Sequence, residues 1–295
     1  MKSLFSIFLL ALSAGTVSAA QVHHQIARAD GSAIHYTLDA PVGESRGLLV
    51  LAQGSGCQPA AASVNLATVR AAFGGFTALI VEKAGVGPGD AGDNGDVDCP
   101  QEFYDRYTLS QRVDDYEQVL SHLAAEGPVP KIVLFGGSEG GLAMEALAAR
   151  IHPDAAILLS GSVGGTFGEM VLSTVPQEGQ ASVRAGFAAA RANPDGTMLS
   201  GHTYRFWADI LDHRSSDYLE ASESPFLLIY GGRDDAPVQP VRGLADRFAE
   251  QGRCNLTYWE FPGLDHGMAD PAGTSRMADI ALLAAAWAEA PIAAC

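Results

Sequence analysis

The stretch at residues 131–147 constrains the fold most, because an apolar run ends there in glycines and a helix-forming segment begins at once. Residues 131–135 read Lys-Ile-Val-Leu-Phe, a short run rich in β-branched residues. Residues 136–140 read Gly-Gly-Ser-Glu-Gly, after which Leu142, Ala146 and Leu147 recur at helical spacing. The pattern predicts a strand, a tight turn and a helix in direct succession.

Ser138 sits at the centre of this turn, between Gly136 and Gly140, with the Gly-x-Ser-x-Gly spacing of a nucleophile elbow. Such a turn forces the serine into a sparsely populated backbone conformation, and only residues without a Cβ fit where strand and helix nearly touch. We expect an exposed Oγ at a helix N-terminus, where free N–H groups favour developing negative charge. The alternative is a glycine-rich strand-to-helix loop without chemistry.

The rest of the chain alternates between apolar runs and helical patterns. Its 295 residues, 47% of them apolar, are enough for a sizeable core. The alternation predicts an α/β fold with a mainly parallel, doubly wound sheet. The expected strands are residues 23–27, 33–38, 47–52, 77–81, 131–135, 155–160, 225–230 and 256–261. The expected helices, besides the one after Ser138, are residues 61–73, 108–125, 240–250 and 273–289.

Between about residues 161 and 224 this alternation breaks. The segment has helical patterns at residues 182–193 and 203–212 and no apolar run typical of a buried strand. We interpret it as a helical cap insertion over the site, with Tyr204 and Trp207 as candidate substrate-binding aromatics. The alternative is a set of surface helices without substrate contact.

The N-terminal residues 1–19 have the pattern of a signal peptide. Lys2 supplies the positive end, residues 4–12 are apolar, and residues 17–19 read Val-Ser-Ala, which suits cleavage after Ala19 or Ala20. The apolar run is too short for a stable membrane anchor, the alternative reading. We therefore expect an exported protein, periplasmic or secreted, whose folded domain covers residues 20–295.

Four cysteines suit an oxidising compartment, and they show neither C-x-x-C spacing nor clustered histidines that would suggest a metal site. Of the three possible pairings we favour Cys57–Cys99 with Cys254–Cys295. The first two cysteines lie in loops after adjacent strands, and the other two lie near the last strand and the end of the chain. Free buried thiols are the alternative.

Parallel sheets bind ligands at the carboxyl ends of their strands, so residues directly after strands are the candidates for chemistry. Ser138 follows one expected strand, Asp234 and Asp235 follow another, and His266 follows the last. The order serine, acid, histidine matches the hydrolase form of the catalytic triad. Asp265 directly precedes the histidine, and neighbours in sequence rarely meet in this geometry.

An oxyanion hole would need two N–H donors. The backbone N–H of Glu139, directly after the serine, is one candidate. The other is the N–H of Ser55 in the glycine-rich loop at residues 53–57. An ordinary glycine turn is the alternative for this loop.

Together these motifs resemble the α/β-hydrolase superfamily over nearly all of residues 20–295. In that family the acid usually stands three residues after a glycine such as Gly231, which favours Asp234 over Asp235. Two features depart from the pattern: many relatives carry His-Gly at residues 53–54, where this chain has Gln-Gly, and Asp-x-Arg-Gly-x-Gly where residues 82–87 read Glu-Lys-Ala-Gly-Val-Gly. The resemblance implies a serine hydrolase without a cofactor, most often acting on esters.

The expected activity is cleavage of a small-molecule carboxylic ester through an acyl-enzyme intermediate. A net charge of −16 argues against nucleic acid as a partner, and the oligomeric state is left open. One alternative is a serine peptidase or amidase of the same fold, in which Glu139, Glu169 or Glu178 would hold a substrate amine. The other is a non-catalytic binding protein with a vestigial site.

Overall fold

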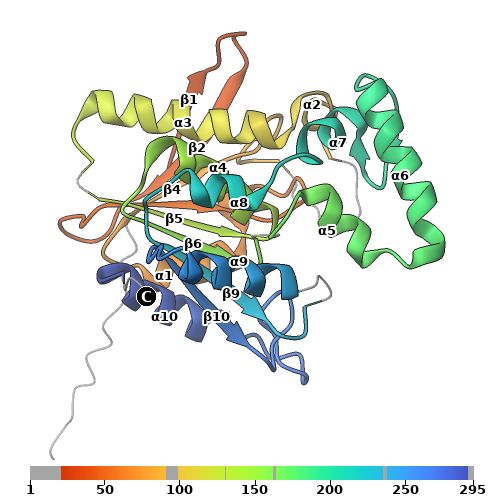
Figure 1. The fold of residues 1–295 in the computed structure, drawn as a ribbon. Coiled ribbons are helices and arrows are strands. Elements are labelled where there is room, and N and C mark those ends of the chain that lie inside the picture. The colour runs from red at the N-terminus through yellow and green to blue at the C-terminus, as the bar shows by residue number, and fades with distance from the viewer. Residues whose placement is uncertain (1–20, 91–98, 130, 162–163, 235–237, 292–295) are drawn as a thin grey trace, which may run out of the picture.

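An eight-stranded sheet runs through the molecule with helices on both faces (Figure 1). The computed structural model describes residues 21–90, 99–129, 131–161, 164–234 and 238–291. The strand order is β1-β2-β4-β3-β5-β6-β9-β10. The strands are β1 (Val22–Ala27), β2 (Ala33–Asp39), β3 (Leu48–Ala52), β4 (Thr77–Val81), β5 (Ile132–Gly137), β6 (Ala155–Leu159), β9 (Phe226–Gly231) and β10 (Leu256–Phe261).

The six strands from β4 to β10 in this order are parallel, and only β1 and β2 run antiparallel to their neighbours. Strand β3 shows why the apolar runs are continuous. Leu48 and Val50 belong to the core on one face of the sheet, while Leu49 and Leu51 belong to the core on the other. A strand covered on both faces needs apolar residues at every position. The predicted fold class is therefore confirmed.

Helices α1 and α10 cover one face together, and α3, α4 and α9 cover the other. Thr108 begins α3 by accepting a hydrogen bond from the N–H of Gln111, as an N-cap residue does. The helices outside the insertion described below are α1 (Val64–Ala72), α2 (Gln101–Arg106), α3 (Leu109–Glu126), α4 (Glu139–Ile151), α9 (Gln239–Glu250) and α10 (Met277–Glu289).

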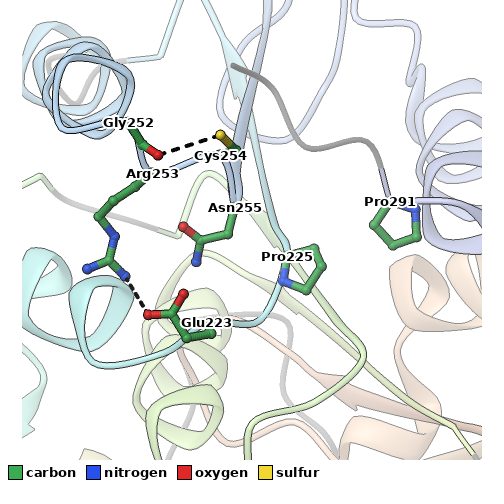
Figure 2. Close-up of a pocket in the computed structure, with 7 residues that line it drawn as sticks. All are labelled: Glu223, Pro225, Gly252, Arg253, Cys254, Asn255 and Pro291. Carbon is green, nitrogen blue, oxygen red and sulfur yellow. Dashed lines mark hydrogen bonds and ion pairs between the residues drawn. The ribbon is translucent and has the colours of Figure 1, made fainter.

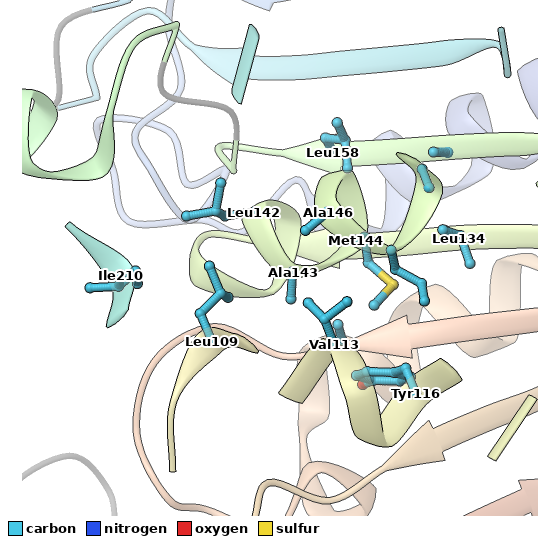
Figure 3. Packing of buried hydrophobic residues seen from close by; sticks show 14 of the residues in the cluster. Leu109, Val113, Tyr116, Leu134, Leu142, Ala143, Met144, Ala146, Leu158 and Ile210 are labelled. Atoms are coloured by element: carbon cyan, nitrogen blue, oxygen red, sulfur yellow. The ribbon is translucent and has the colours of Figure 1, made fainter. Parts of the chain in front are cut away.

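The helix that follows Ser138, α4, is the most deeply buried of these. Small and apolar side chains of α4 meet α3 on one side and strands β5 and β6 on the other (Figure 3). Leu142 and Ala143 lie near Leu109 and Val113 of α3, all of them almost inaccessible to solvent. Close packing of this kind fixes the position of the helix, and with it the position of Ser138 at its start.

The insertion between β6 and β9, at residues 161–224, consists mainly of helices. Helices α5, α6 and α7 lie together at one end of the molecule (right in Figure 1). Helix α7 packs on α3, and α8 packs on α4. The elements are α5 (Phe167–Thr174), α6 (Gln177–Ala192), α7 (Tyr204–Ile210), α8 (Ser215–Glu220) and a short hairpin of β7 (Met198–Leu199) with β8 (His202–Thr203).

Two helices begin later than the sequence pattern predicted. Residues 60–62 form a 3₁₀ turn, and Ser63 then caps α1 by accepting from the N–H of Leu66. The last helix begins at Met277 because the carboxylate of Asp270 accepts N–H groups of Ala272 and Thr274 and holds those residues in a loop. Residues 1–19, Asp235 and Cys295 lie outside the described residues.

Candidate active site

Ser138 stands at the junction of β5 and α4 with backbone angles φ 54° and ψ −128°. This left-handed conformation is rare for a residue with a side chain and marks a tight turn. A Cβ at Gly136 would lie 2.2 Å from the carbonyl oxygen of Gly140, so only glycine fits there. Similarly, a Cβ at either Gly141 or Gly161 would lie 2.5 Å from the Cα of the other. Although Ser138 is the N-cap residue, its side chain makes no capping hydrogen bond, which leaves Oγ available.

His266 and Asp234 come together from the loops after β10 and β9. His266 Nδ1 lies 2.8 Å from Asp234 Oδ2, and the Asp234 side chain is 3% exposed while that of His266 is 49% exposed. Because an ionised carboxylate only accepts hydrogen bonds, Nδ1 carries the proton and Nε2 is left as an acceptor. The hydroxyl of Ser160 also donates to the His266 carbonyl at 3.1 Å and holds this loop in place.

Asp265, the neighbour of the histidine, has a different role. Its Oδ1 accepts hydrogen bonds from the N–H groups of Gly267 at 3.0 Å and Ala269 at 2.8 Å. The carboxylate therefore shapes the loop that carries His266 and does not approach the imidazole as a partner. Asp235, the other candidate acid, is not among the described residues.

Ser138 and His266 line the same cavity, of about 150 Å³. The cavity lies on the α1 and α10 side of the sheet, and most of its walls are apolar side chains. Ser63 and Asn65 at the start of α1 add polar groups. The apolar lining comes from Leu66, Val69, Phe135, Leu159 and Met277, with Ala52, Gln53, Gly54, Gly137 and Gly267 completing the wall.

The loop after β3 approaches the serine directly. A Cβ at Gly54 would lie 3.3 Å from Cβ of Ser138, so this part of the loop packs tightly against the serine. Ser55, the predicted donor, is the next residue and is exposed. Glu139, the other predicted donor, is the first residue of α4. Both predicted N–H donors thus belong to segments that adjoin Ser138.

A buried group of charged side chains lies behind this loop, and the sequence analysis did not find it. The group, here called the Lys83 cluster, consists of Lys83, Tyr107, Arg112 and Glu139. Glu139 Oε1 accepts from Lys83 Nζ at 3.2 Å, from an Arg112 guanidinium nitrogen at 3.1 Å and from the Tyr107 hydroxyl. One sequence signal existed: Arg112 falls between Leu109, Val113 and Tyr116 on the apolar face of α3.

The pKa values in the Lys83 cluster reflect its isolation from water. Burial lowers the pKa of the Lys83 ammonium to about 8, although the Glu139 carboxylate favours the charged form. Burial alone would raise the pKa of Glu139, but the charges of Lys83 and Arg112 and the Tyr107 hydroxyl outweigh it and lower this pKa to about 2. Around neutral pH the carboxylate is therefore ionised, and its Oε1 atom has three partners.

Tyr204 and Trp207, the predicted substrate-binding aromatics, are not part of the lining of the cavity that Ser138 and His266 share. Trp207 is 7% exposed, its indole N–H donates to the Leu199 carbonyl at 2.7 Å, and its ring contacts Phe187. Tyr204 begins α7, and neither aromatic side chain lines the cavity beside Ser138. Trp207 thus packs in the interior of the insertion, and the role of these two aromatics in substrate binding stays a prediction.

A larger cavity, of about 420 Å³, lies away from the triad residues. Figure 2 shows its lining, which includes Glu223, Arg253 and Asn255. These residues directly precede β9 and β10, whereas Asp234 and His266 follow the same two strands. The cavity is therefore at the amino edge of the sheet, where ligands of parallel α/β folds do not usually bind. The smaller cavity at the carboxyl edge is the better candidate.

The predicted Cys57–Cys99 disulfide is present, with the two Cα atoms 5.6 Å apart. It ties the loop that carries Gly54 and Ser55 to the segment before α2. No free cysteine occurs in the described part of the chain. The second predicted bridge, Cys254–Cys295, stays a prediction because Cys295 lies outside that part. Within the same ranges no helix is long and apolar enough to cross a membrane, and no three acidic, His or Cys side chains are grouped to hold a metal ion.

No model of a known protein family matches the sequence, and no curated protein matches it. Solved structures do match. Est1E from Butyrivibrio proteoclasticus with bound ferulic acid has 17% identity and a TM-score of 0.62, over 90% of this chain and 97% of that one. The Paleococcus ferrophilus monoacylglycerol lipase has 17% identity and a TM-score of 0.63, over 86% of this chain and 98% of the lipase. A Mycobacterium tuberculosis puromycin-hydrolyzing peptidase has 16% identity and a TM-score of 0.64, over 92% of this chain but 39% of the peptidase.

These structures share one architecture with the protein, a mainly parallel sheet flanked by helices. The chain has the α/β-hydrolase fold, as the resemblance implied. At such low identity the likeness concerns the fold, and the neighbours range from esterases and lipases to peptidases.

Proposed function

We propose that the protein is a serine hydrolase that cleaves carboxylic esters of small molecules, with Ser138, His266 and Asp234 as its catalytic triad. The observation that carries the proposal is the pairing of the His266 ring with the buried Asp234 carboxylate at 2.8 Å, on the same cavity as the uncapped hydroxyl of Ser138. Three loops that follow three different strands supply these groups, as the hydrolase triad requires.

The proposed reaction has two stages. Ser138 Oγ attacks the ester carbonyl while Nε2 of His266 accepts its proton, and the N–H groups of Ser55 and Glu139 stabilise the oxyanion. The imidazolium then protonates the leaving alcohol, and the acyl group remains on Ser138. A water molecule that gives its proton to His266 releases the acid and restores the serine. Asp234 keeps the proton on Nδ1 and stabilises the imidazolium.

A fluorophosphonate probe tests the nucleophile, because such probes react covalently with activated serines. We expect one label per chain on Ser138, hydrolysis of p-nitrophenyl acetate, and loss of both in Ser138→Ala. Equal labelling of the Ser138→Ala protein would refute the assignment. Absence of both labelling and turnover in the unaltered protein would instead support the non-catalytic alternative.

The size of the cavity beside Ser138 favours substrates with a short acyl group. An apolar cavity of about 150 Å³ holds a group about the size of benzene, which corresponds to acyl chains of roughly four to six carbons. We expect kcat/KM on p-nitrophenyl esters to be highest for such chains and to fall at least tenfold for chains of about twelve carbons. A maximum at the longest chains would contradict this use of the cavity.

The peptidase alternative has less support, because two of its three candidate carboxylates are engaged. Glu139 is buried among cations, and Glu169 accepts the N–H of Thr166 in a capping box. Only Glu178 is exposed without such a role. Aminoacyl amides of matched size, assayed beside the esters, distinguish the two functions: preferential cleavage of the amides would favour the peptidase.

A further inference from the structure

The Lys83 cluster makes contacts that ion pairing alone does not require. Lys83 Nζ donates to the carbonyl oxygens of Gly54 at 2.7 Å and Gly56 at 2.8 Å, in addition to Glu139. A lysine ammonium has three N–H donors, and these three acceptors use all of them. The Lys83 side chain is 0% exposed, so it does not contact a substrate itself.

Arg112 makes a similar hydrogen bond to the carbonyl of Gln53, the residue before Gly54. One nitrogen of its guanidinium donates to Glu139 at 3.1 Å, and another donates to the carbonyl oxygen of Gln53 at 2.7 Å. The two cations therefore hold the carbonyls of three residues in the loop after β3.

These contacts determine where the loop's N–H groups point. In a planar trans peptide the carbonyl oxygen and the following N–H face opposite ways. The hydrogen bond from buried Lys83 to the Gly54 carbonyl therefore turns the N–H of Ser55 away from the protein interior. In the same way, the hydrogen bond from Arg112 to the Gln53 carbonyl turns the N–H of Gly54 outward. Gly54 lies next to Ser138. A glycine-rich loop without these contacts could rotate its peptides at little cost.

The same cluster also holds the other side of the site. Glu139 receives both cations through its side chain, and its backbone N–H begins α4 directly after Ser138. One buried carboxylate thus joins the two segments that supply the expected N–H donors. Burying these charges is costly, and such networks persist where their geometry matters.

We propose that Lys83 is a positioning residue that, with Arg112 and Glu139, holds the oxyanion hole in its reactive arrangement. The inference rests on the proposed function. Lys83 acts through the peptides of residues 54–57 and leaves substrate binding unaffected, because preorganised N–H groups contribute mainly in the transition state.

Lys83→Met tests the role, since methionine has a similar length and no N–H donors. We expect kcat on the best ester to fall about 100-fold, as for loss of one oxyanion donor, with KM within about twofold. The inhibition constant of a trifluoromethyl ketone that mimics the tetrahedral state should weaken by the same factor as kcat/KM. A kcat within threefold of the unaltered enzyme would overturn the proposal.

Lys131→Met is the matched control, because Lys83 and Lys131 are the only lysines after Lys2. Lys131 Nζ also donates to a backbone carbonyl, that of Ala288 at 2.9 Å, but it precedes β5, roughly 20 Å along the strand from Ser138. We expect its kcat to be unchanged. If the unaltered protein neither hydrolyses esters nor reacts with the phosphonate, the proposed function itself fails.

A measurement on the unaltered protein keeps the proposal testable if Lys83→Met does not fold. Lysine side-chain NMR signals from ¹⁵N-labelled protein, assigned with Lys131→Arg, are compared before and after phosphonylation of Ser138. We expect the Lys83 signal to shift when the phosphonyl oxygen occupies the oxyanion hole, and the Lys131 signal to stay in place. An unmoved Lys83 signal would contradict the coupling.

Discussion

At the scale of single residues, two carboxylates near His266 have different roles in the site. Asp265 is its neighbour in sequence, and Asp234 is its neighbour in space. The first organises the backbone of the loop, and the second orients the imidazole. Their substitution should therefore affect different measurable quantities.

For Asp234→Asn we expect kcat to fall about 10⁴-fold, because an asparagine can hold the imidazole in the wrong tautomer. Thermal stability should change little. Asp265→Asn serves as the comparison: it weakens the hydrogen bonds to Gly267 and Ala269, so the melting temperature should fall while kcat drops far less. Steady-state kinetics and thermal unfolding measure both effects. A larger kcat loss in Asp265→Asn would exchange the two assignments.

At the scale of elements, the loop after β3 is held at three places. Lys83 and Arg112 hold its carbonyls, and the disulfide to Cys99 holds it at Cys57. The disulfide closes a loop of 42 residues, so its loss increases the conformational freedom of the unfolded chain.

For the double variant Cys57→Ser, Cys99→Ser we expect the free energy of unfolding to decrease by about 4 kcal/mol. Urea denaturation measures this loss. In conditions where the variant stays folded, kcat should also fall, because one of the loop's three attachments is missing. An unchanged urea midpoint would show that the bridge contributes nothing to stability.

At the scale of the whole molecule, the Lys83 cluster links stability to pH. The folded-state pKa of Glu139, about 2, lies below the ordinary value of 4.5 for a glutamate carboxyl group. A lowered carboxylate pKa stabilises the fold above the unfolded-state pKa, and this contribution disappears as the pH falls from 4.5 to 2. The groups that face the carboxylate are Lys83, Arg112, Tyr107 and His202.

We therefore expect Glu139→Gln to be less stable than the unaltered protein at pH 7 and to lose less stability between pH 4.5 and 2. Urea midpoints across this range give the comparison, and the other carboxylates cancel in the difference. Parallel pH profiles for the two proteins would exclude a depressed pKa at Glu139.

Much of the fold, and the placement of the three proposed triad residues at one edge of the sheet, could be predicted from the sequence, because each depends on local pattern plus one topological rule. Apolar runs identified the strands, and the carboxyl-edge rule then brought Ser138, Asp234 and His266 together. No such rule predicts the Lys83 cluster. Its members come from four separate segments, and charged residues ordinarily indicate a solvated face. The sequence also could not place Trp207, because an aromatic residue in a helical insertion suits a binding surface and a core equally well.

The contact between Gly141 and Gly161 bears on how this protein can be altered by directed evolution. Each glycine has the Cα of the other where a methyl group would go, so replacing one cannot make room for replacing the other. A saturation library should return almost no active clones at either position, even in pairs. Changes of substrate preference are better sought in the wall formed by α1 and Met277.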